Sequence, residues 1–153
     1  MGSCGIKSGK RKTPLIHLYL RVDELDNVGR HWIIKDAVTG ELMATARLTL
    51  HSTLNDSYRD VQLWRNCGKH LPLPTVDLGR LVVLSKFRGR GLAQLLNVTR
   101  IQAAREMGAN SIMVTASAGN ARLLKKLGFE DIGETAYFDD RQGTCFYALQ
   151  YNF

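Results

Sequence analysis

The chain has 153 residues, of which 44% are hydrophobic and 23% are charged, an ordinary composition for a globular domain. No apolar stretch approaches the roughly 20 residues of a membrane-spanning helix, so no stable membrane insertion is expected. The net charge is +7, but four of the basic residues lie before residue 13. The remaining excess is modest for a nucleic-acid-binding protein, and it suits a small polyanionic ligand equally well.

The first twelve residues, MGSCGIKSGKRK, predict a flexible basic tail, and residues 13–153 predict a single domain. Gly2 and Cys4 are compatible with lipidation, but Ile6 stands where a myristoylation pattern has Ser or Thr. A flexible tail is therefore favoured. Binding of nucleic acid through this tail would be strongly salt-dependent, and no nucleic acid is expected as a partner.

The three cysteines are Cys4, Cys67 and Cys145, an odd and widely spaced set that contains no CxxC pair. Neither a metal site nor a disulfide framework is expected from this spacing. A reducing compartment, the cytoplasm, is the predicted location.

The first half of the chain has the weaker secondary-structure pattern. Thr13–Val22 is apolar and fits either a strand or a helix. His31–Lys35 and Glu41–Leu50 predict two strands of a hairpin, since a glycine-containing turn joins them. Ser52–Pro74 is irregular, with room for one short helix before its prolines.

The second half alternates strands and helices more clearly. The apolar run Leu81–Leu84 predicts a strand buried on both faces. From Gly91 to Met107 a helix is predicted, ended by Gly108. Its buried face is predicted to carry Leu92, Leu95, Leu96, Thr99 and Ala103.

Three further elements complete the prediction. Ser111–Thr115 reads as a short buried strand, Asn120–Leu127 as a helix, and Thr144–Tyr151 as a closing strand. An exposed edge at this last strand could pair two copies in a homodimer. The alternation predicts an α/β (α+β) fold with a parallel strand pair in its middle.

The stretch LSKFRGRGLAQLL, residues 84–96, places glycines and cations at the start of a predicted helix. The first amides of a helix have no partner within it, and the helix dipole makes this end positive. Gly89 and Gly91 would let an anion approach those amides. The stretch lacks the Lys-Ser/Thr ending of a Walker A loop, and Gln94 stands where a dinucleotide fingerprint has Gly or Ala.

The same stretch resembles the pyrophosphate-binding signature of the GNAT acetyltransferase superfamily. That signature has Gln or Arg, two variable residues, Gly, one variable residue, then Gly or Ala, and Arg88, Gly91 and Ala93 fill it. A second block, SIMVTASAGNARLLKKLGFEDIGE, resembles the family's fifth strand and the helix that follows. The resemblance runs from His31 to the C-terminus. It implies a GNAT-like fold, a mixed, mostly antiparallel sheet with a central splayed parallel strand pair and flanking helices.

The resemblance also implies a cofactor site. Acetyl-CoA would lie in the V-shaped gap between the splayed strands, and no metal is implied. The cofactor-binding residues implied are Leu81, Val82 and Val83 for the pantetheine arm, Arg88, Gly89, Arg90, Gly91, Leu92 and Ala93 for the pyrophosphate, and Asn120 in the second block.

The catalytic residues are less well indicated, because Leu124 stands where family members often have a tyrosine acid. Tyr137 is the nominated substitute, with Tyr147 as an alternative. The acid is dispensable if the thiolate, with a free pKa near 8.5, leaves unaided. A base or water chain must deprotonate the amine. The candidate bases are Glu41, His51, His70 and Asp77.

The resemblance therefore implies an acetyl-CoA-dependent N-acetyltransferase acting on a primary amine of a small molecule or a protein. The alternative is a non-catalytic CoA-binding sensor of the same fold, which Leu124 and the short segment before the hairpin would suit. The acceptor pocket is then either open or walled by Ser52–Pro74.

Overall fold

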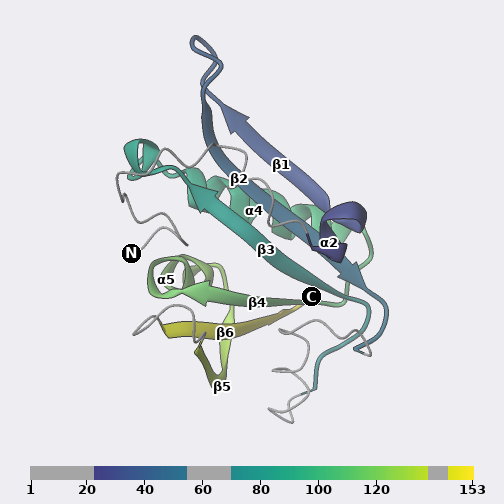
Figure 1. Ribbon diagram of the computed structural model, residues 1–153. Helices are drawn as coiled ribbons and strands as arrows, with labels where there is room; N and C mark the ends of the chain where they lie inside the picture. Colours follow the sequence, from purple (N-terminus) through teal and green to yellow (C-terminus); the bar gives the residue numbers. More distant parts are fainter. Residues whose placement is uncertain (1–22, 55–69, 138–144) are drawn as a thin grey trace.

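The computed structural model describes residues 23–54, 70–137 and 145–153. The predicted tail 1–12, the segment Thr13–Val22 and part of Ser52–Pro74 lie outside the described residues. The described elements are α2 (Glu24–Val28), β1 (Arg30–Lys35), β2 (Leu42–His51), β3 (Thr75–Val83), the short 3-10 helix η1 (Ser85–Phe87), α4 (Leu92–Glu106), β4 (Ser111–Ser117), α5 (Ala118–Lys126), β5 (Glu130–Tyr137) and β6 (Cys145–Asn152) (Figure 1).

The described strands form one six-stranded sheet in the order β1-β2-β3-β4-β6-β5. Every neighbouring pair is antiparallel except β3 and β4, which are parallel. The parallel pairing joins Thr75–Asp77 to Ser111–Met113 and goes no further, although both strands continue. Beyond this seam β3 and β4 diverge (Figure 1). The predicted mixed sheet with a central splayed pair is confirmed.

Helices α4 and α5 pack on one face of the sheet. Their shared core joins strand residues such as Val76, Ile112 and Leu149 to Ala104 of α4 and Leu124 of α5. The short helix α2 lies on the opposite face, in front of β2 in Figure 1. The two faces differ, since the α4–α5 face carries the largest apolar cluster and the α2 face carries the buried Arg47.

The strand predicted at Leu81–Leu84 is real but longer than expected, because β3 begins at Thr75. The expectation that Leu81–Leu84 is buried on both faces is wrong. Burial is complete at Thr75–Leu78, whereas Val82 is 43% exposed. The reason is the splay, because β4 no longer flanks β3 beyond Asp77.

The helix predicted from Gly91 is confirmed as α4, and Gly108 follows its end with a positive φ of 76°. Its buried face differs from the predicted one. Leu95 is 55% exposed, while Asn97 and Arg100 are fully buried. The buried face of α4 therefore includes two polar side chains that the predicted face did not contain.

The closing strand is confirmed as β6, but it is not an edge. The strand β5, which the sequence pattern did not predict, pairs with β6 on the side away from β4. The edge-strand argument for a homodimer through Thr144–Tyr151 is therefore wrong.

Candidate functional site

The turn between β3 and α4 is shaped by two glycines in the left-handed region. Gly89 has φ 77° and Gly91, the N-cap of α4, has φ 76°. The first backbone bond of α4 runs from the Leu95 N–H to the Gly91 oxygen, at 3.0 Å. The amides of the first helical turn before Leu95 therefore have no partner within the helix, as an anion-binding site requires.

Among the described residues, no neighbouring atom demands that these two positions lack a side chain. A Cβ built at Gly89 or Gly91 meets no atom of residues 23–54, 70–137 or 145–153 within 4 Å. The left-handed backbone alone selects glycine, since other residues pay roughly 1–2 kcal/mol there. The part of the chain that the structure describes thus leaves the space beside both glycines open to a ligand.

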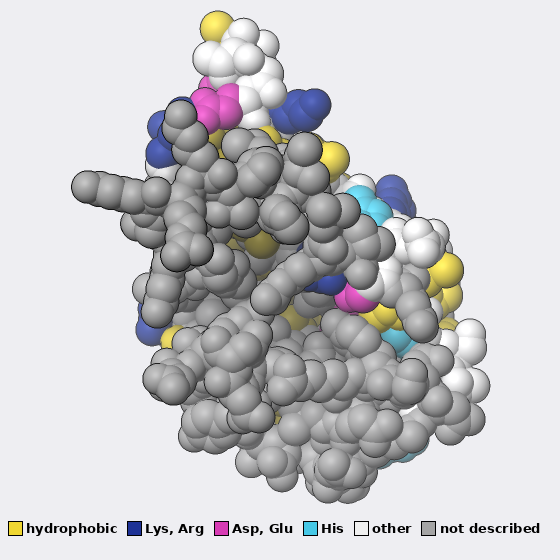
Figure 2. Space-filling view, viewed as in Figure 1, with side chains coloured by type: hydrophobic (Ala, Val, Ile, Leu, Met, Phe, Trp, Pro, Cys, Tyr) yellow, Lys and Arg dark blue, Asp and Glu magenta, His cyan; other side chains and the backbone are white. Residues whose placement is uncertain are grey.

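The three cations of the turn are exposed, and each is held by a protein group. Lys86 Nζ lies 2.6 Å from Glu41 Oε2, and Arg88 Nε donates to the Val83 oxygen at 3.2 Å. The Arg90 guanidinium lies 5.3 Å from the centroid of the buried Phe87 ring. No acidic residue lies in the first turn of α4. Basic side chains gather with acidic ones around the upper end of the molecule in Figure 2.

Strand β3 contains a bulge just before the segment that leads into this turn. Arg47 of β2 pairs with Gly79, but Thr45 pairs with Val82, so β3 carries one extra residue. Within the bulge Arg80 has a left-handed φ of 55°. Bulges bend a strand and increase its twist. This bulge begins two residues after the last pair with β4, which is where the splay opens.

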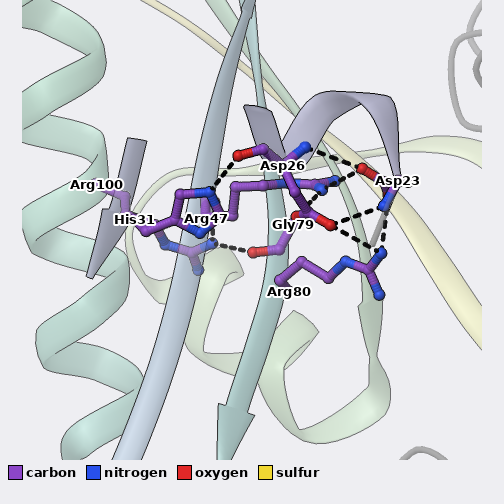
Figure 3. Close-up of polar contacts among 7 residues, drawn as sticks. All are labelled: Asp23, Asp26, His31, Arg47, Gly79, Arg80 and Arg100. Atoms are coloured by element: carbon purple, nitrogen blue, oxygen red, sulfur yellow. Dashed lines mark hydrogen bonds and ion pairs between the residues drawn. The ribbon is translucent and has the colours of Figure 1, made fainter. Parts of the chain in front are cut away.

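Charged side chains hold the α2 face of the bulge (Figure 3). Arg47 Nη1 donates to Asp23 Oδ1 at 2.7 Å and to Asp26 Oδ1 at 2.6 Å. Arg80 Nη2 donates to Asp23 Oδ2 at 2.9 Å. The Arg47 side chain is 1% exposed, against 38% for Arg80. The sequence analysis did not single out these residues, although Asp23 and Asp26 form a capping box at the start of α2.

The charge network lowers the pKa of Asp26 below its usual value of 3.8. Burial acts in the opposite direction and raises it, but the hydrogen bond from the Asp23 amide, the hydrogen bond and charge of Arg47, and the charge of Arg80 together outweigh burial. Asp26 is therefore held in its ionised form.

Gly79 lies beneath the charged groups of the bulge. A Cβ at this position would lie 3.2 Å from Arg47 Nη2 and 3.4 Å from Asp77 Oδ2. The two side chains therefore pack directly over the glycine. Asp77 itself is buried and belongs to the last parallel pair, opposite Met113, so it stands where the two strands part.

The structure does not bring the four candidate bases together. Glu41 pairs with Lys86 beside the glycine turn, and Asp77 lies at the opening of the splay. His51 is buried at the end of β2, opposite Thr75. His70 is exposed before β3, and its carbonyl accepts from Gln150 Nε2 at 2.8 Å.

The residues of the second block have structural partners. Leu124 is fully buried in the core, so this position supplies no acid. Asn120 Oδ1 accepts from Asn97 Nδ2 at 2.7 Å. The backbone of Tyr137 ends β5, with β6 between that strand and β4, and its side chain lies outside the described residues. Its role as an acid stays a prediction.

Two further observations concern metal ligands and membrane-spanning helices. Within residues 23–54, 70–137 and 145–153, no three His, Cys, Asp or Glu residues are close enough to hold a metal ion. None of the described helices combines the length and apolarity that crossing a bilayer requires.

Comparison with known proteins relates the chain to one family. The model of the Acetyltransferase (GNAT) family matches residues 8–129. No protein among the curated sequences matches the chain. Among solved structures, mosquito arylalkylamine N-acetyltransferase like 5b has a TM-score of 0.65 at 14% identity, covering 80% of this chain and 74% of that one.

Two other solved structures are similar in fold. TofI in an apo form has a TM-score of 0.63 at 16% identity, covering 90% of this chain and 75% of its own. A Bacillus subtilis acetyltransferase in complex with CoA has a TM-score of 0.56 at 15% identity, covering 93% and 84%. At these identities the likeness concerns the fold alone.

Proposed function

Since the chain belongs to the GNAT acetyltransferase family, we propose that it transfers an acetyl group from acetyl-CoA to a primary amine of a small molecule or a protein. One observation carries the proposal. The parallel strands β3 and β4 separate after Asp77, and β3 then runs directly into a turn with two left-handed glycines. A gap between strands and an anion-binding turn suit the two halves of CoA, the amide-rich arm and the pyrophosphate. We take residues 13–153 as the catalytic domain and 1–12 as a tail.

The pyrophosphate would lie on the turn that runs from Arg88 to Ala93, against the amides from Gly89 onward. The Arg88 amide itself donates to the Ser85 oxygen at 3.3 Å. Each hydrogen bond to a charged group is worth about 1.5–3 kcal/mol, whereas an exposed ion pair is worth about 0.2–1 kcal/mol. Backbone donors therefore supply most of the affinity. Lys86, Arg88 and Arg90 add longer-range attraction.

The pantetheine arm would lie along the β3 edge at Leu81, Val82 and Val83. The Val83 carbonyl already accepts from Arg88 Nε at 3.2 Å. A pantetheine amide would compete for this carbonyl, and the displaced guanidinium is close in sequence to the pyrophosphate turn. We expect Arg88 to exchange one partner for the other when CoA binds.

The reaction would join a neutral amine to the thioester carbonyl, with a backbone N–H near Val83 polarising that carbonyl. The tetrahedral intermediate then expels the CoA thiolate, whose free pKa near 8.5 makes it a fair leaving group. Among the four candidates we favour Asp77 as the carboxylate that orients the amine, because it lies where the strands part. Flanked by Arg47, its carboxylate would orient the amine by accepting a hydrogen bond, and water would carry the proton away.

The competing proposal is a CoA-binding sensor without catalysis, which the buried Leu124 favours because no acid stands at that position. An amine panel separates the two. The full chain is supplied with acetyl-CoA and a series of alkyl, aromatic and peptide amines, and free thiol is measured. An enzyme would release thiol with at least one amine, whereas a sensor would bind CoA and release no thiol with any amine. Absence of CoA binding by calorimetry would refute both.

A further inference from the structure

A chain of buried hydrogen bonds runs through α4. Neither the geometry of the glycine turn nor the packing of the apolar core requires it. Asn97 and Arg100 have no exposed surface. They share the helix face that carries Leu96, Ala103 and Ala104 into the core. Polar side chains in such positions cost stability unless they are fully hydrogen-bonded, so their partners indicate what they do.

At one end of this chain, Arg100 reaches the bulge between β2 and β3. Its Nη1 donates to the Arg47 oxygen at 3.0 Å and to the Gly79 oxygen at 3.2 Å. Arg47 and Gly79 are the register partners at which the regular ladder breaks. The Nη1 group of Arg100 therefore bridges the carbonyls of both strands at the break, from the side opposite to α2 (Figure 3).

At the other end, the chain reaches the segment that follows β4. Arg100 Nη2 donates to Asn97 Oδ1 at 2.8 Å, and Asn97 Nδ2 donates to Asn120 Oδ1 at 2.7 Å. Asn120 lies in the first turn of α5, three residues after β4 ends. The chain from Asn120 through Asn97 to Arg100 thus links the two arms of the V, the β3 arm and the β4–α5 arm.

The buried guanidinium is unfavourable by itself. Burial lowers the pKa of Arg100 to about 10, and the charge of Asp77 offsets only part of that effect. An aliphatic residue would complete the helix face without this cost, because replacing buried charges by apolar groups is often neutral or stabilising. The cost of burying the Arg100 guanidinium has an explanation if the candidate CoA site needs the strand geometry that this side chain imposes.

The direct seam between the two arms is short, at three residue pairs. A seam of this length leaves the angle between the arms weakly determined, because the β3–β4 ladder does not extend beyond Asp77. The buried chain spans the arms beyond the seam, beneath the gap. It can therefore fix the separation that the ladder leaves open.

We propose that Arg100 and Asn97 are positioning residues that set the separation of β3 and β4, and so align the β3 edge with the pantetheine arm of CoA. The inference rests on the proposed function. The turn at Gly89 and Gly91 has its own backbone geometry, which the two left-handed φ values define. The two halves of CoA should therefore respond differently when the chain is broken.

The test compares two ligands on the full protein by calorimetry. CoA reports on both the turn and the gap, whereas 3′-phospho-ADP lacks the pantetheine arm and reports on the turn alone. For Arg100→Lys and for Asn97→Leu we expect CoA to bind at least about tenfold more weakly, the equivalent of one lost hydrogen bond to a charged group. Binding of 3′-phospho-ADP should change by less than about threefold. Arg105→Met, on the exposed side of α4, is the control and should leave both affinities within about twofold.

Each result bears on the inference. Equal weakening of both ligands would show a general loss of structure and would overturn the positioning role, as would unchanged affinities. Asn97→Ser, which adds no apolar bulk, supplies the same comparison if the first variants do not fold. If the wild-type protein binds neither ligand, the proposed function itself is refuted. This result needs no variant, so it is distinguishable from a failure of the positioning role.

Discussion

Arginines occupy two contrasting places around the splay. Arg88 and Arg90 are exposed on the glycine turn, and their partners there are a carbonyl and an aromatic ring. Arg47 and Arg100 are fully buried at the bulge, one on each face of the sheet. We expect the loss of Arg88 or Arg90 to do little damage to the fold. Arg47 and Arg100, in contrast, make hydrogen bonds to groups on both sides of the bulge.

The contrast follows from solvation. Exposed charge pairs contribute about 0–1 kcal/mol because water and salt screen them. Removing one partner of a buried pair costs about 3–5 kcal/mol, since the other charge is left without compensation. The exposed arginines of the turn thus contribute attraction to an anion, and the buried Arg47 and Arg100 contribute to the geometry of the bulge.

The largest expected effect is that of Arg47→Met on stability. Asp23 and Asp26 would lose their shared donor, and we expect the free energy of unfolding to fall by about 3 kcal/mol, the low end for buried pairs because both carboxylates are partly exposed. Urea unfolding measures the change. The matched control is Arg80→Met, which removes an exposed donor to the same Asp23 and should cost about 0.2–1 kcal/mol. Equal losses in the two variants would abolish the distinction between buried and exposed arginines.

An intermediate effect is expected at the turn itself. Gly91→Val forces a β-branched residue to φ 76° and covers the amides, so CoA should bind at least about tenfold more weakly, with roughly 1–2 kcal/mol of strain as one cause. Arg90→Ala removes one exposed cation and should weaken CoA by about two- to fivefold. Calorimetry with folded variants measures both. If Arg90→Ala proved the more damaging, side-chain charge and not the backbone would dominate.

The smallest expected effect is a pH dependence at α2. The pKa of Asp26 is lowered in the folded protein, so its contribution to stability is present above the unfolded value of 3.8 and is lost as the pH falls through the lower, folded value. Asp26→Asn should therefore be less stable than the wild type near pH 7, with the gap narrowing towards about pH 3. Urea unfolding at both pH values measures the gap. A gap of constant size would mean that Asp26 acts without its charge.

The turn was predictable from sequence because its determinants are local. Two glycines, the neighbouring cations and the start of an amphipathic helix all lie within a few residues, and the observed φ values at Gly89 and Gly91 agree with them. The splay was also anticipated, through the resemblance of two blocks of sequence to one family. The residue roles within the site stay predictions.

The bulge network was not predictable in the same way. Asn97 and Arg100 lie on the buried face of α4. The periodicity of apolar residues instead predicted Leu95 on that face and assigned polar residues to the solvent side. Their partners are distant in sequence, since Arg100 bonds to carbonyls 53 and 21 residues away. Only the fold brings them together.

Two elements were missed for different reasons. The start of α2 had a local signal, the reciprocal capping of Asp23 and Asp26, which a search for Asp at both positions would find. Strand β5 begins with Glu130 and Asp131, acidic residues that oppose a strand assignment. In the sheet β5 is an outer strand, and charged residues are usual on such strands.

The three-pair seam divides the sheet into two half-sheets, β1-β2-β3 and β4-β6-β5, each built from one continuous part of the chain. A molecule that lies in the gap would make hydrogen bonds to both half-sheets and would stabilise their association. Amide hydrogen exchange should then slow in both halves at once on saturation, including strands that never touch the ligand.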